Sequence, residues 1–476
     1  MSARRGSLTL VRYFVDGQPP RDLRKRYLEA VRLRAFQPLK PEDEATEATG
    51  WCVMERPLDL EFELDKLFND RLLQLGLRVD KFRIPSSAIN AELADEERKL
   101  LTKTGAEKIS RQQRKELKKR VVVKLRRKLV PISRAFDLCW DLDAGVVFFF
   151  SHSRRLGEEL CALFEKTFQL RLIEDSPYVV AKRAKLPATI LKALDRVMPV
   201  SYVNGRKQLG LPDAAPEPAT ALVAGSPSPK PRPADPVDAE PTSETGADEG
   251  SRAGAEKKPP AAKKAASDKA GGAEKVDPEE DALSTRVETT RFLGPEFLLW
   301  LWLRAELTQG PFSLGEHGEY EVWLDRQITL QSALDANERV TVRGSAPSDS
   351  SEAREAVKAQ KFPVRARVVM QSTEPEFACV LDALRYALAT AQVPAVLTQE
   401  PEQAFLERME LLLRLFAILD GLYAQFLQDR LSDTWSRGYE PALVAWFESQ
   451  AVPARVLKHL AKDISTAPQK KRRRSA

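Results

Sequence analysis

The chain has 476 residues, of which 43% are hydrophobic and 30% are charged. This is ample apolar material for a buried core, and the length suggests about three units. No run approaches the ~18 consecutive apolar residues of a membrane helix, and no apolar segment typical of a signal peptide follows the first residues. These features disfavour a secreted or integral membrane protein and predict a cytoplasmic one.

The cysteines and histidines disfavour a metal site. The four cysteines, Cys52, Cys139, Cys161 and Cys379, form no CxxC pair, and a chain of this length has only three histidines. This spacing fits neither a zinc site nor a disulfide framework. We therefore expect buried, reduced thiols, and the sequence predicts no metal and no cofactor.

The middle of the chain differs in composition from both ends. No Phe, Trp or Tyr occurs from Val203 to Arg291, and twelve of the 32 prolines lie between Pro212 and Pro278. Such a segment cannot bury enough apolar surface to offset its chain entropy. We predict a disordered linker at 206–287 that separates an N-terminal half, 1–205, from a C-terminal half, 288–435. A helical extension with a basic tail, 436–476, is expected to follow.

Hydrophobic periodicity predicts strands and helices in both halves. In the N-terminal half we expect strands at 8–15, 73–79 and 146–150, and helices at 22–33, 91–129 and 154–168. In the C-terminal half we expect a buried helix from Phe297, strands at 320–324 and 362–368, and a long amphipathic helix at 402–435. The fold class is therefore predicted to be α+β, with antiparallel sheets. The apolar stripe of the last helix is expected to be core, with an oligomer contact as the alternative.

No catalytic motif is present. The sequence lacks GxxxxGK[ST], GxGxxG after a strand, HExxH and GxSxG. Adjacent acidic residues are more typical of a solvated surface than of a metal-dependent nuclease. We therefore predict a protein that is not an enzyme, and a nuclease on an unrecognised fold remains an alternative.

The strongest signal is a basic segment. Between Lys103 and Lys128 the chain has twelve Lys and Arg residues against two Glu. A helix there places Arg111, Arg114, Lys115 and Lys118 within one face of about 100°. Such a face suits contacts with DNA phosphates, and a solvated helix without a ligand is the alternative. The residues predicted to bind DNA are Lys108, Arg111, Arg114, Lys115, Lys118, Lys119, Lys124, Arg126 and Arg127.

A second basic cluster lies near the end of the sequence. It consists of Lys470, Lys471, Arg472, Arg473 and Arg474. It could act as a nonspecific DNA-binding arm or a localisation signal, or it could be an inert solubilising tail.

Several segments, in this order, resemble the bacterial recombination-associated protein RdgC family. They are Gly50-Trp51, Phe82-Arg-Ile-Pro-Ser-Ser-Ala-Ile89, residues 109–119, Leu129-Val-Pro-Ile-Ser-Arg-Ala-Phe136, Trp140-Asp141 and Glu296-Phe-Leu-Leu-Trp-Leu-Trp302. The resemblance covers about 7–200 and 290–435. The long linker and the residues after Trp435 depart from the family pattern.

The resemblance implies a binding protein. Members of the family form ring-shaped homodimers that hold double-stranded DNA without sequence preference and antagonise RecA filaments. For this chain it implies a nucleoid-associated homodimer whose cations at 111–119 face DNA and whose Phe136 lies near a dimer contact. A scaffold that binds the recombinase directly, touching DNA only through its tails, is the alternative partner assignment.

Overall fold

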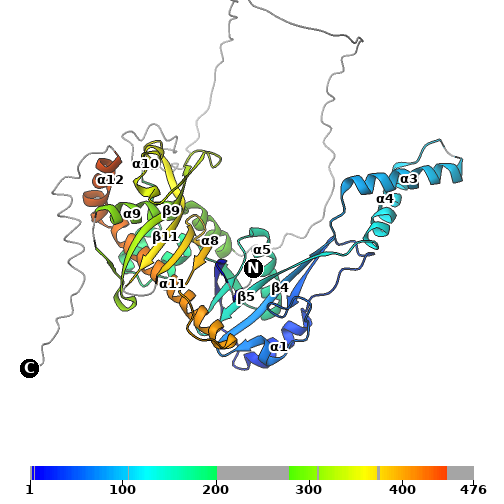
Figure 1. Cartoon of the computed structure of the whole chain (residues 1–476), viewed down its shortest axis with the longest axis horizontal. Helices are drawn as coiled ribbons and strands as arrows, with labels where there is room; N and C mark the ends of the chain where they lie inside the picture. The colour runs from blue at the N-terminus through cyan, green and yellow to red at the C-terminus, as the bar shows by residue number, and fades with distance from the viewer. Residues whose placement is uncertain are drawn as a thin grey trace, which may run out of the picture. The chain divides into compact units, whose positions relative to one another are not determined.

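The first strand of the chain is shared between two groups of antiparallel strands (Figure 1). The structure, a computed structural model, describes residues 3–4, 6–105, 107–200, 278–307, 310–372 and 376–447. All of these residues except Pro278 belong to one compact unit. The predicted tail cluster at 470–474 and nearly all of the predicted linker lie outside the described residues.

The N-terminal strands are ordered β1-β6-β5-β4-β2, with β3 against β4 and β7 against β1. They are β1 (Leu8–Asp16), β2 (Glu47–Cys52), β3 (Phe68–Asn69), β4 (Leu72–Lys81), β5 (Ile132–Asp141), β6 (Val146–Phe149) and β7 (Arg171–Glu174). The alternating leucines at 73–77 therefore form part of β4, as the period-2 pattern predicts.

The C-terminal strands continue the same sheet in the order β10-β9-β11-β12-β13-β1. They are β8 (Phe312–Ser313), β9 (Glu319–Ser332), β10 (Arg339–Arg343), β11 (Lys361–Gln371), β12 (Phe377–Asp382) and β13 (Ala387–Gln392). Leu8 and Leu10 lie opposite Ala391 and Leu388. The two predicted halves therefore share one sheet, because the first strand pairs with the last.

Twelve α-helices occur in the described residues. They are α1 (Leu23–Leu33), α2 (Leu64–Leu67), α3 (Ser86–Thr104), α4 (Arg111–Arg126), α5 (Arg154–Phe168), α6 (Pro177–Arg183), α7 (Ala188–Leu194), α8 (Pro278–Thr289), α9 (Leu293–Leu307), α10 (Ser351–Lys358), α11 (Pro401–Arg430) and α12 (Glu440–Phe447). The predicted α+β class with antiparallel strands is confirmed. None of the helices described combines the length and apolar content that crossing a membrane requires.

Two sequence predictions need correction. The helical segment predicted at 91–129 is a hairpin of α3 and α4, because Gly105 ends α3 with a positive φ of 63°. The last part of the predicted linker, up to residue 287, is helical, since α8 begins at Pro278. Leu283 and Val287 of α8 pack against the core, which explains why this part of the segment is helical.

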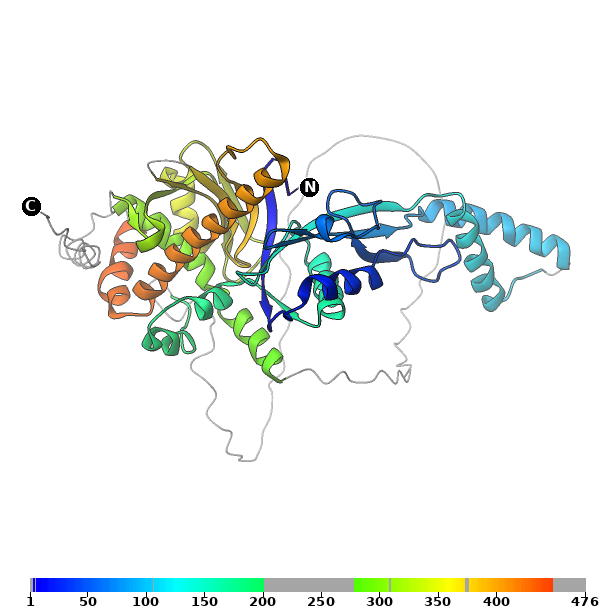
Figure 2. The ribbon, with the colours of Figure 1, turned by 90° about the horizontal axis from the view of Figure 1, so that it is seen from below.

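The C-terminal core surrounds α9. Every residue from Leu293 to Leu303 is buried, as expected for a helix that is apolar on all sides. Helix α11 packs along the same core, and Figure 2 shows it (orange) running along one face of the C-terminal strands. The predicted apolar stripe of α11 is buried throughout, from Phe405 to Phe426.

A buried arginine connects the first strand, β1, to helix α11. Arg12 of β1 donates from Nε to Asp175 at 2.6 Å and from both terminal nitrogens to Asp420 of α11 at 2.7 and 2.8 Å. The rings of Phe14 and Phe416 flank its guanidinium, with centroids 4.9 and 4.3 Å away. This cluster connects three parts of the chain, namely β1, the segment that precedes α6, and α11.

We expect Arg12→Met to lower the free energy of unfolding by about 3–5 kcal/mol, because it strands the buried carboxyl of Asp175. Asp175→Asn should cost less, since the neutral amide avoids the penalty of burying a charge. Equilibrium denaturation followed by tryptophan fluorescence measures both. Equal losses for the two variants would contradict this account.

The same cluster predicts a pH dependence. Burial, only partly offset by Arg12, raises the pKa of Asp175 from 3.8 to about 7. A carboxyl whose pKa is higher in the folded than in the unfolded state contributes less to stability as the pH rises from the unfolded-state pKa to the folded-state pKa. The deficit of Arg12→Met, in which Asp175 has lost its cation, should therefore shrink between about pH 8 and about pH 5. A deficit that is constant over this range would rule out Asp175 as its source.

Candidate nucleic-acid interface

The predicted basic segment forms a helical hairpin at the end of two strands. Helices α3 and α4 are inserted between β4 and β5, which pair along their whole length from Leu72 opposite Asp141 to Lys81 opposite Ile132. Both views show the hairpin beyond the ends of these strands (Figures 1 and 2). The hairpin therefore presents its side chains away from both hydrophobic cores.

Helix α4 begins at a complete capping box. Ser110 Oγ accepts from the backbone N–H of Gln113 at 3.2 Å, and the Gln113 side chain accepts from the backbone N–H of Ser110 at 3.0 Å. The box satisfies two backbone donors of the first turn. It fixes where the helix starts and hence the direction in which Arg111 projects.

Two cations of α4 are paired with α3. Arg114 lies 2.7 Å from Glu97, and Lys124 contacts both Glu92 and Glu96. The hydrogen bond from Lys124 lowers the pKa of Glu92. Arg114 and Lys124 therefore stabilise the hairpin, and their charges are partly neutralised.

Three further cations contact the loop before β2. Lys119 pairs with Glu44 at 3.4 Å and Arg127 pairs with Glu42 at 2.8 Å. Arg126 is 4% exposed, donates to the carbonyl of Asp43 and lies 5.3 Å from the ring centroid of Phe82. The prediction that Arg126 contacts DNA is therefore wrong, because its guanidinium is buried against the loop.

The remaining predicted cations of α4 form an exposed stripe. Arg111, Lys115 and Lys118 are exposed and have no carboxylate partner in the part of the chain that the structure describes. Their spacing of four and three residues places them on one face of the helix. We call these three residues the α4 stripe. Lys108, in the loop before α4, is exposed as well.

Phe136 lies in the first half of β5, the strand that follows α4. Its ring is half-buried and packs against Phe149, with centroids 6.3 Å apart. Val130 and Ile132, which precede it in the chain, are exposed by 88% and 46%. That Phe136 lies near a dimer contact stays a prediction.

The structure also assembles basic residues that the sequence patterns did not reveal. Lys81, Arg83, Arg134 and Arg155 line one cavity, although they come from three separate segments, 81–83, β5 and α5. None of these segments has more than two neighbouring cations, so no long charge run indicates the group. The register of β4 and β5 and the position of the start of α5 bring these residues together.

No three His, Cys, Asp or Glu side chains in the described residues are grouped so that they could hold a metal ion. All four cysteines are free, and Cys52, Cys139 and Cys379 are buried as expected. Burial raises the pKa of Cys52 and of Cys379 to about 12. These thiols are therefore unreactive packing groups.

Comparison of the whole chain with known protein families and with curated proteins finds no match to either. The resemblance described under Sequence analysis therefore rests on the residues quoted there.

Removing the cap should loosen α4 locally. Ser110→Ala is expected to cost the first turn about 1 kcal/mol, which speeds hydrogen exchange of the backbone amides of 112–115 by about fivefold. Exchange mass spectrometry measures this change. Ser87→Ala, an exposed serine of α3, is the matched control and should leave α4 unchanged. Equal protection in the two variants would show that the cap does not hold the start of α4.

Proposed function

We propose that the protein binds double-stranded DNA without sequence preference through the α4 stripe, and that it does so as a homodimer in the nucleoid. The observation that carries the proposal is the exposure of Arg111, Lys115 and Lys118 on one helix face without carboxylate partners in the described residues. DNA bound in this way competes with RecA-type filaments for the same duplex.

The division of charges on α4 supports this proposal. Acidic residues neutralise the side of α4 that faces α3 and the end near β2, but not the stripe. Three cations occupy about 10 Å of helix axis, and the same length of duplex carries about six phosphates. A cation paired to a phosphate releases condensed counterions, which gives affinity that does not depend on base sequence.

The homodimer, its ring form and the RecA partner rest on the family resemblance. The half-buried Phe136 and the exposed Val130 and Ile132, which precede it in the chain, are compatible with a subunit contact. A closed ring would add topological retention to a small number of phosphate contacts. Sedimentation of the full chain tests the dimer, with a Phe136→Ser variant expected to dissociate more readily.

The salt dependence of DNA binding tests the proposal. Fluorescence anisotropy of a labelled random-sequence duplex is measured over a salt series for the wild type and for Arg111→Ala/Lys115→Ala/Lys118→Ala. Each lost phosphate contact reduces the log–log slope by about 0.9, so the variant should flatten it by about 2–3. The change should be uniform across duplex sequences.

A charge-matched variant provides the control. Lys166→Ala/Lys185→Ala/Lys192→Ala removes three exposed cations of α5, α7 and the segment between α6 and α7. It should retain the wild-type slope. Equal slopes for the wild type and the stripe variant would contradict the proposal. Loss of binding on deletion of 466–476 and the linker would instead favour the scaffold alternative, and Mg²⁺-dependent loss of the labelled duplex would favour the nuclease.

A further inference from the structure

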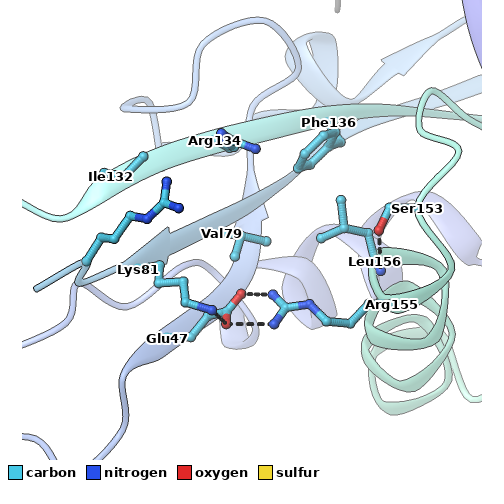
Figure 3. A pocket seen from close by; sticks show the side chains of 10 residues that line it. Glu47, Val79, Lys81, Ile132, Arg134, Phe136, Ser153, Arg155 and Leu156 are labelled. Carbon is cyan, nitrogen blue, oxygen red and sulfur yellow. Dashed lines mark hydrogen bonds and ion pairs between the residues drawn. The ribbon is translucent and has the colours of Figure 1, made fainter. Parts of the chain in front are cut away.

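A basic cavity lies at the base of the α3–α4 hairpin, apart from the α4 stripe. Figure 3 shows the side chains that line it. Its volume is about 370 Å³. It is lined by Glu47, Val79, Lys81, Arg83, Ile132, Arg134, Phe136, Ser153, Arg155 and Leu156. We call it the β4–β5 pocket.

Strand register creates this pocket. Glu47, Lys81 and Ile132 lie side by side on β2, β4 and β5, and Val79 lies opposite Arg134 one row further in. Because side chains alternate along a strand, these residues share one face of the sheet. Helix α5 begins at Arg154, so Arg155 and Leu156 lie in its first turn. They form one wall of the pocket, and the strands extend beyond this first turn.

The charges around the pocket are unbalanced. Its lining holds four cations and one carboxylate, Glu47. Glu47 pairs with Lys81 at 3.3 Å and with Arg155 (Figure 3), and the hydrogen bond from Arg155 lowers the pKa of Glu47. Glu47 thereby stays ionised and holds these two cations in place.

Arg83 and Arg134 supply the unneutralised charge. Both are exposed, and neither has a carboxylate partner within the described ranges. A guanidinium presents two parallel N–H donors that match the oxygens of a phosphate. An anion that enters the pocket therefore meets two guanidinium groups whose charge no carboxylate offsets.

The lining is also partly apolar. Val79, Ile132, Phe136 and Leu156 lie among the cations, and Phe136 is the aromatic ring of the lining (Figure 3). An inorganic anion gains no favourable contact from such apolar side chains, whereas a nucleobase packs well against aromatic and aliphatic side chains. The cavity volume falls in the range of small-ligand sites.

We propose that the β4–β5 pocket binds one unstacked nucleotide, with its phosphate on Arg83 and Arg134 and its base against Phe136. This nucleotide is either a free nucleoside monophosphate or one unit of a single DNA strand. Binding of a single strand would extend the proposed DNA-binding function, whereas binding of a free nucleotide does not depend on that function.

The test compares small probes with strands on the full chain. Calorimetry measures binding of thymidine 5′-monophosphate, thymidine and inorganic phosphate, and anisotropy measures a labelled oligothymidine and a duplex. Wild type is compared with Arg83→Ala/Arg134→Ala and with the charge-matched Lys166→Ala/Lys192→Ala. Arg83 and Arg134 are exposed, so their truncation should leave the fold intact.

The pocket variant should lose about tenfold or more in affinity for the monophosphate or for the oligothymidine, because it removes two charge-assisted contacts. The control should bind as the wild type does. If the pocket variant loses affinity for both the monophosphate and the oligothymidine, the pocket takes free nucleotides as well as units of a single strand. If it loses affinity for one of the two probes, that probe identifies the source of the nucleotide.

Three results would overturn the proposal. The first is unchanged affinity of the pocket variant for both the monophosphate and the oligothymidine. The second is binding of inorganic phosphate as tight as that of the monophosphate, which would show a plain anion site. The third is displacement by an acidic peptide with no binding of either nucleotide probe.

The outcome is separable from that of the proposed function. The stripe variant, Arg111→Ala/Lys115→Ala/Lys118→Ala, leaves the pocket intact and should bind the monophosphate normally while losing affinity for the duplex. Failure of duplex binding with retained monophosphate binding would remove the proposed function and leave the pocket assignment standing.

Discussion

The buried cluster around Arg12 is the contact on which the rest of the structure depends. Among the described strands, β1 is the one that pairs with both groups, and Arg12 lies in its middle. Its guanidinium satisfies Asp175 and Asp420 together, so it links a loop of the N-terminal part to α11. Arg385 adds a second such link through Glu174 at 2.6 Å and through the carbonyl of His152. Directional, charge-assisted contacts of this kind fix orientation as well as distance.

A fixed sheet has consequences for the hairpin at its far end. Strands β4 and β5 pair over ten residues each, and their ends next to the hairpin extend beyond helix α5. The α3–α4 hairpin begins and ends on these strands, and its ion pairs divide the cations of α4 into those that hold the structure and those that remain available. Charge counting in the sequence treats both kinds alike. Only the second kind can neutralise a phosphate without first breaking an internal pair.

The α4 stripe and the β4–β5 pocket present two different chemistries on one extension. The stripe is a row of exposed cations, suited to a regular phosphate backbone. The pocket combines guanidinium groups with an aromatic ring and aliphatic side chains, suited to a single nucleotide. A protein with both kinds of surface could contact a duplex and an unpaired nucleotide next to it.

The sequence by itself determined the α+β class, most of the core and the basic helix. Periodic leucines marked β4, a continuous apolar run marked β6, and the stripe from Phe405 to Phe426 marked α11, because these patterns reflect burial that is local to each element. The tertiary structure decided which cations are free and where strands meet. Arg126 belongs to a basic run and is nevertheless buried under Asp43, and Arg83 and Arg134 lie 51 residues apart in the sequence yet share a pocket. Both outcomes depend on pairing between segments far apart in the chain, and local composition carries no information about that pairing.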